Sequence, residues 1–107
     1  MSVTIQISDN IAQHLTQLII GQATEIDQKL SSLLQSEYRR RLARYSLTDR
    51  QLQQKYGMTF AEFEQQQMTK QQNYSWEVES DAMAWETAVD GIETIQRQLT
   101  DLLYANN

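Results

Sequence analysis

A stripe of apolar residues with helical spacing runs through the C-terminal third of the chain and limits what the rest of the chain can fold into. Its members recur at separations of three, four and seven residues: Val78, Ala82, Trp85, Val89, Ile92, Leu99 and Leu103. This is the roughly 3.5-residue period of a helix that lays one continuous face against another helix or into a groove. The spacing predicts one long amphipathic helix over residues 74–103, whose apolar face must be covered by the rest of the chain or by a partner.

Charge is divided unevenly along the sequence. Residues 1–46 hold five basic and four acidic side chains, a net of +1, whereas residues 47–107 hold four basic and ten acidic ones, a net of −6. Such a division predicts two surfaces with different partners. Acidic residues also crowd the first turns of the predicted long helix, where the helix dipole favours anions: Glu77, Glu79, Asp81 and Glu86.

The composition narrows the class of protein. The 107 residues predict one domain, or a small folded head with a helical extension, and the absence of proline with only three glycines favours helices. The absence of cysteine excludes a disulfide framework, a thiolate metal site and a cysteine nucleophile. No apolar run approaches the roughly 20 residues that span a bilayer, and no signal-peptide pattern begins the chain, so we expect a cytoplasmic protein without a membrane partner.

Residues 2–8 have the pattern of one short β-strand. Val3, Ile5 and Ile7 alternate with polar residues, and such β-branched alternation is typical of a strand with one buried face. A single strand of this length is not stable alone, and the sequence contains no second one. We therefore expect the same strand of a second copy to pair with it, giving a homodimer or a higher homo-oligomer.

Residues 10–45 carry two helical stripes. Asp9 or Asn10 can cap the first helix, and Gly21 can end it in a left-handed conformation. Thr24 then offers a new N-cap for a second helix. A single helix over residues 10–45 remains the competing interpretation, because the two stripes stay in phase and a glycine inside a helix costs only about 1 kcal/mol. We prefer two helices.

Residues 47–73 predict a helical hairpin and a linker. Thr48 and Thr59 are each followed three residues later by Gln or Glu, which is the capping-box signature of a helix start. Gly57 is suited to a left-handed helix end, so the pattern predicts short helices over 49–56 and 60–67. Ser75 can cap the long final helix.

The order of strand, helix, glycine-containing turn and helix in residues 1–45 resembles the ribbon-helix-helix family of dimeric DNA-binding proteins. In that family paired strands enter the major groove, which implies that Thr4 and Gln6 face the bases of operator DNA. The strand itself carries no Lys or Arg, where the family commonly has one. The basic residues that could contact phosphates follow later in the chain: Arg39, Arg40, Arg41 and Arg44.

Residues suited to enzyme chemistry are few. His14 is the one histidine, and no phosphate-binding glycine loop or metal-ligand spacing is present. The neighbouring carboxylates of the long helix are explained by its dipole without acid–base work. We predict that the protein is not an enzyme and holds no metal or cofactor.

Several stretches resemble small cyanobacterial antitoxin-like proteins of type II toxin–antitoxin modules. The resemblance covers about residues 38–100 and is carried by Tyr38-Arg39-Arg40-Arg41-Leu42, Lys55-Tyr56-Gly57-Met58-Thr59-Phe60 and Tyr74-Ser75-Trp76-Glu77-Val78-Glu79-Ser80-Asp81. It implies an N-terminal region that dimerises or binds DNA, and a C-terminal segment that wraps around a toxin and blocks it. The charge division supports this independently, because an acidic amphipathic helix complements a basic RNA-cleaving site.

We therefore predict an antitoxin that occludes a cognate toxin and binds operator DNA, with a mainly α fold and one N-terminal strand. Its regions are a ribbon-helix-helix-like dimerisation and DNA-binding region (1–46), a helical hairpin with linker (47–73) and an acidic partner-binding helix (74–107). The predicted partner-binding residues are Tyr74, Trp76, Glu77, Val78, Glu79, Asp81, Trp85, Val89 and Ile92. The alternative is a helical homo-oligomeric assembly or scaffold protein that binds neither DNA nor a toxin.

Overall fold

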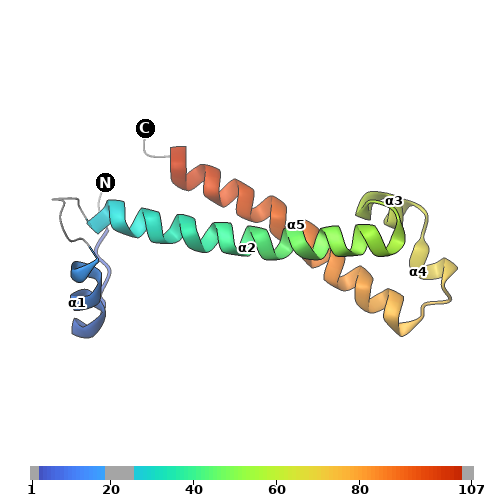
Figure 1. The fold of residues 1–107 in the computed structure, drawn as a ribbon, viewed down its shortest axis with the longest axis horizontal. Helices are drawn as coiled ribbons and strands as arrows, with labels where there is room; N and C mark the ends of the chain where they lie inside the picture. The colour runs from blue at the N-terminus through green and yellow to red at the C-terminus, as the bar shows by residue number, and fades with distance from the viewer. Residues whose placement is uncertain (1–2, 19–25, 105–107) are drawn as a thin grey trace. The chain divides into compact units, whose positions relative to one another are not determined.

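The computed structural model describes residues 3–18 and 26–104, and the regular structure of these residues is entirely helical (Figure 1). Their helices are α1 (Asp9–Gln17), α2 (Ile26–Tyr56), α3 (Phe60–Gln65), α4 (Met68–Gln71) and α5 (Trp76–Tyr104). Internal contacts divide the chain into an N-terminal unit, Met1–Ser36, and a C-terminal unit, Glu37–Asn107. Within the described ranges, no helix is both long and apolar enough to cross a lipid bilayer.

The predicted N-terminal strand, and with it the ribbon-helix-helix head, is wrong. Residues 3–7 form no β-bridge with any described residue, and their side chains are exposed. Ser8 begins α1 instead of Asp9 or Asn10, because its hydroxyl accepts a 3.2 Å hydrogen bond from the backbone N–H of Ile11. A serine cap needs only local contacts, whereas a strand needs a second strand, and residues 3–18 and 26–104 supply none.

The preferred division of residues 10–45 into two helices is confirmed. α1 ends at Gln17, with Leu18 as its C-cap, and α2 is described from Ile26. The predicted helix end at Gly21 and the predicted cap at Thr24 lie outside the described residues.

The break predicted after Tyr45 is wrong, because α2 continues through residues 46–48 to Tyr56. The Thr48 hydroxyl does not cap a new helix; it donates a hydrogen bond of 3.3 Å to the backbone carbonyl of Arg44, one turn earlier. Serine and threonine can satisfy their hydroxyls in this way inside a helix, so neither residue forces an end. With no proline or glycine in this stretch, the helix has no reason to stop before Gly57.

The turns that join α2 to α5 follow the sequence more closely. Gly57 ends α2 with a positive φ of 66°, as predicted. Thr59 caps α3 in a complete capping box with Glu62, and Ser75 caps α5 by accepting a 3.3 Å hydrogen bond from the backbone N–H of Val78. The long C-terminal helix is therefore confirmed, with its start within two residues of the predicted one.

The core of the C-terminal unit lies where the end of α2, α3 and the first half of α5 meet. Trp85 is fully buried there, with its ring centroid 5.1 Å from that of Phe63, 5.4 Å from Phe60 and 5.9 Å from Tyr56. Leu52 and Val78 complete the buried cluster. α5 also contacts α3 and α4 directly, so α2, α3 and α4 together cover the first half of its apolar stripe, whereas Leu103 near its end is 40% exposed.

Candidate protein-binding surface at the start of α5

The predicted partner-binding residues fall into a buried and an exposed set. Val78 and Trp85 are core residues, and Val89 packs against the same cluster while Ile92 is half-buried. The chain itself therefore covers this part of the stripe. We call residues 74–81, at the beginning of the helix, the α5 head; within it Tyr74, Trp76 and Glu77 are exposed, Glu79 and Asp81 are half-buried and Val78 is buried.

Two aromatic side chains of the α5 head are turned to solvent. Trp76 is 82% exposed and Tyr74 is 59% exposed. Tyr74 also has a positive φ of 55°, a left-handed conformation that costs energy for a bulky residue, and its backbone N–H donates 2.8 Å to the carbonyl of Thr69. The turn thus holds a tyrosine in an unfavourable backbone conformation while leaving its ring uncovered.

A polar cluster ties the α5 head to the end of α2. The Lys55 ammonium lies 2.7 Å from a carboxylate oxygen of Glu77 and 2.6 Å from one of Asp81. The Tyr56 hydroxyl donates a 2.6 Å hydrogen bond to the same Asp81 oxygen. Two of the predicted partner-binding carboxylates therefore already have a basic neighbour inside the chain, whereas Glu79 has no ion pair in the described structure.

This cluster changes the proton affinity of its members. The hydrogen bonds from Lys55 to Asp81 and to Glu77 raise the pKa of the lysine well above 10.5. Burial, followed by the hydrogen bond to Asp81, raises the pKa of Tyr56 to about 12. Burial alone would raise the pKa of Asp81, but the hydrogen bonds from Lys55 and Tyr56 outweigh it, so that this pKa lies below 3.8. At neutral pH Lys55 is therefore protonated, Asp81 is ionised and Tyr56 keeps its hydroxyl proton.

Sequence reasoning missed Asp49, Lys55 and Tyr56, which position α5. The Asp49 carboxylate accepts a 2.8 Å hydrogen bond from the indole N–H of Trp85, and the other two hold Asp81. Asp49 precedes Lys55 by six residues and Tyr56 by seven, and Asp81 precedes Trp85 by four. This spacing of polar and aromatic residues on two helices is the signal that could have identified them.

The predicted DNA-binding residues belong to two different units. Thr4 and Gln6 are exposed in the extended segment of the N-terminal unit, and no paired ribbon presents them. The arginines lie on α2 in the C-terminal unit, where Arg40 and Arg41 pair with Glu37 at 3.0 and 3.1 Å. The hydrogen bond from Arg41 is the main cause that lowers the pKa of Glu37. A role in DNA binding for Arg39, Arg40, Arg41 and Arg44 stays a prediction.

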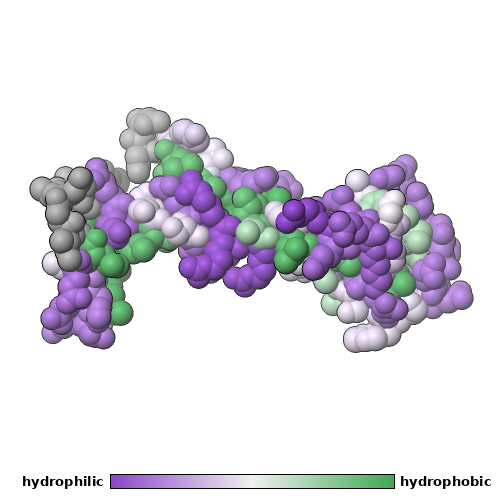
Figure 2. Space-filling model, in the orientation of Figure 1, coloured by the Kyte–Doolittle hydropathy of each residue, from purple (hydrophilic) through white to green (hydrophobic). Residues whose placement is uncertain are grey.

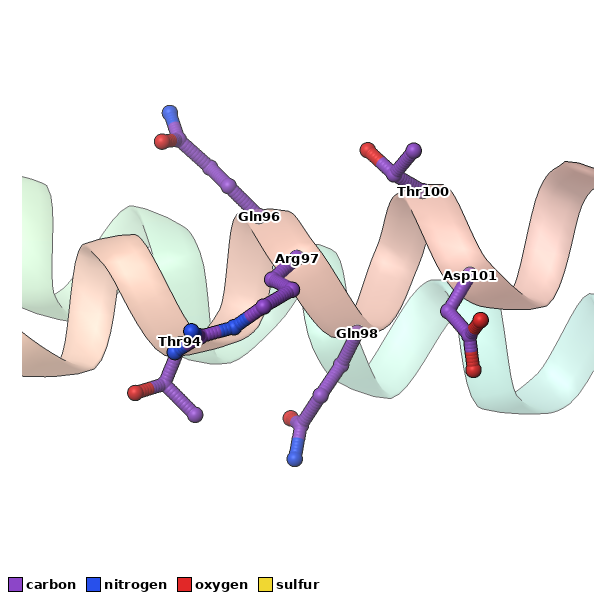
Figure 3. Close-up of a pocket in the computed structure, with 6 residues that line it drawn as sticks. All are labelled: Thr94, Gln96, Arg97, Gln98, Thr100 and Asp101. Carbon is purple, nitrogen blue, oxygen red and sulfur yellow. The ribbon is translucent and has the colours of Figure 1, made fainter.

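A hollow near the end of α5 carries no site. Figure 3 shows its lining residues projecting in different directions from one helix, and no second element contributes a side chain: Thr94, Gln96, Arg97, Gln98, Thr100 and Asp101. Among the described residues, no group of three or more His, Cys, Asp or Glu side chains is placed to hold a metal ion. The α5 head, with its exposed aromatics and carboxylates, is thus the better candidate.

Comparisons of the chain with protein-family models, with curated proteins and with solved structures found no match.

Proposed function

We propose that this chain is an antitoxin that binds a basic toxin through the α5 head and blocks it by occlusion. The observation that carries the proposal is the 82% exposure of Trp76 beside the carboxylates of Glu77 and Glu79. Tryptophan and tyrosine are the residues most often found at the centre of protein interfaces, where truncation commonly costs 2 kcal/mol or more. An aromatic anchor among carboxylates suits a partner with an apolar pocket in a basic surface.

The rest of α5 extends the same acidic character along its exposed side. Glu86, Asp90 and Glu93 are exposed and form no ion pair with any described residue. Their charges are available to attract a cationic protein and to speed its association. Occlusion of a basic RNA-cleaving site needs only this complementarity and no chemistry by the antitoxin.

Operator binding is not part of the proposal. Base reading by Thr4 and Gln6 required a paired ribbon, and the described residues form no strand. The resemblance to antitoxin-like proteins supports the toxin-blocking role separately, because one of the stretches that carry it is the α5 head.

Co-expression with the product of the adjacent open reading frame tests the proposal. The wild-type chain should co-purify with that product and rescue cells from its toxicity. A variant with Tyr74→Ala and Trp76→Ala should lose both effects, with affinity falling by about 30-fold or more for a loss of 2 kcal/mol.

A matched control keeps this test specific. Met83→Ala with Tyr104→Ala also removes two exposed large side chains of α5, 70% and 64% exposed, but lies outside the α5 head. It should bind and rescue as wild type does. Truncation before α5 is not an equivalent test, because it removes Trp85 from the core. Absence of co-purification by the wild-type chain, or full binding by the α5-head variant, would overturn the proposal.

A further inference from the structure

The N-terminal unit exposes its apolar side chains instead of burying them. None of its described side chains, in residues 3–18 and 26–36, is buried. The large apolar residues that remain more than a third exposed are Val3, Ile5, Ile7, Ile11, Leu18, Ile26, Leu30, Leu33 and Leu34. Figure 2 shows hydrophobic surface around α1 and the first turns of α2. We call these nine residues the N-terminal apolar patch.

Most residues of the N-terminal apolar patch line a single hollow. Residues of the extended segment, α1 and the start of α2 surround one hollow of about 570 Å³, in which His14 and Asp27 are the polar members. On α2 the exposed residues Ile26, Leu30 and Leu33 are four and three residues apart, which is the spacing of a helix-pairing seam. The hollow and the seam together form a face that another helical surface can fill.

The size of the patch argues for a stable partner. Nine such side chains, 37–85% exposed, present on the order of 800 Å², which is about what one partner contributes to a standard protein interface. Monomeric proteins typically leave no apolar patch larger than about 300–600 Å². Ordering this unit also costs conformational entropy that no buried core of its own offsets.

The small net charge of the N-terminal unit, together with the size of the patch, favours a second copy of the chain as the occupant. The described part of the N-terminal unit carries Asp9, Asp27 and Lys29, so it is nearly neutral, in contrast to the acidic residues 47–107. A strongly basic or acidic partner would find little to recognise there. The same face of a second copy is equally apolar and nearly neutral, and a two-fold contact covers both patches at once.

We propose that the N-terminal apolar patch is a homodimerisation surface formed by two-fold packing of α1 and the first turns of α2. The dimer does not depend on the α5 head. Dimerisation can therefore fail while a toxin still co-purifies, and toxin binding can fail while the dimer persists.

Sedimentation equilibrium of the full chain tests the dimer. The wild-type chain should be dimeric, and Leu30→Glu with Leu33→Glu should be monomeric while circular dichroism retains the helical signal of the C-terminal unit. The matched control Leu47→Glu with Met83→Glu adds the same charge at residues 48% and 70% exposed in the C-terminal unit, and should remain dimeric. A monomeric wild-type chain at every soluble concentration, or equal dissociation by both variants, would overturn the proposal.

Cross-linking tests the same contact without adding charges to the patch, which could by themselves disturb folding. Because the chain has no cysteine, Leu33→Cys introduces one thiol into the patch, and Met83→Cys introduces one outside it. Mild oxidation should convert the Leu33→Cys chain into a covalent dimer and leave the Met83→Cys chain largely monomeric. Equal yields of covalent dimer from the two variants would contradict a specific N-terminal contact.

Discussion

The indole N–H of Trp85 donates a hydrogen bond of 2.8 Å to a carboxylate oxygen of Asp49. Trp85 is fully buried, and the second oxygen of Asp49 accepts a 3.1 Å hydrogen bond from the Gln53 side chain. The donor of the largest buried side chain is thus satisfied from α2, and this bond fixes the position of α5 along α2. A buried polar group left without a partner is costly, so the pair is a sensitive point of the fold.

Replacing Asp49 with alanine should destabilise the C-terminal unit by about 1–3 kcal/mol, because it leaves the Trp85 indole N–H unsatisfied. Urea unfolding followed by tryptophan fluorescence in a Trp76→Phe background measures this, since Trp85 is then the one emitter. Asp90→Ala, at an exposed position of α5, should stay within about 0.5 kcal/mol of wild type. Equal stability of the two variants would mean that the Asp49–Trp85 bond contributes nothing.

Gly91→Ala should destabilise the protein although alanine is the better helix former. An added Cβ would lie 2.6 Å from ring carbons of Tyr45, so the ring has to move, at an overpacking cost of about 1–3 kcal/mol. The double variant Gly91→Ala with Tyr45→Ala should lose less than the two single losses added together. A stabilisation of about 1 kcal/mol by Gly91→Ala, as in an isolated helix, would show that α2 and α5 are farther apart than described.

Protonation of Asp81 should lower the stability of the protein in acid. Its pKa lies below the ordinary 3.8, so its contribution to folding is complete above that value and is lost as the pH falls through the folded-state pKa. Urea midpoints measured between about pH 6 and pH 2 should therefore fall less steeply for Asp81→Asn than for wild type. Asp101→Asn, on the exposed end of α5, should leave the fall of the urea midpoint with decreasing pH as it is in wild type. If the urea midpoint of Asp81→Asn fell with decreasing pH as steeply as that of wild type, the Lys55–Asp81–Tyr56 cluster would be contradicted.

Thr59→Ala should cost about 0.5–2 kcal/mol, because it removes the N-cap of α3. The Thr59 hydroxyl accepts from the Glu62 backbone N–H at 3.2 Å, and the Glu62 carboxylate accepts from the Thr59 backbone N–H at 3.1 Å. Thr59→Ser keeps both bonds and should remain near wild-type stability in thermal unfolding. A loss as large in the serine variant would assign the effect to the threonine methyl group instead.

Features that depend on a few neighbouring residues were predictable. The capping box at Thr59, the left-handed end at Gly57 and the cap at Ser75 were each identified from sequence, because each needs contacts over only three or four residues. The helix start predicted at Thr48 from the same capping-box signature is wrong, because Thr48 lies inside α2. The two threonines differ in what precedes them, since glycine ends the helix before Thr59 and nothing ends it before Thr48.

The sequence by itself determined the long C-terminal helix, its apolar face and its acidic start, because helical periodicity is a local property of the chain. Only the tertiary structure decided what covers that face. Side chains distant in sequence, Asp49 and Phe63 among them, close over Trp85, and no pattern within one segment specifies such a contact. The packing buried the middle of the predicted binding helix and left Trp76 at its head exposed. It also left the predicted strand without a partner, because β-pairing needs a second strand and the described part of the chain contains none.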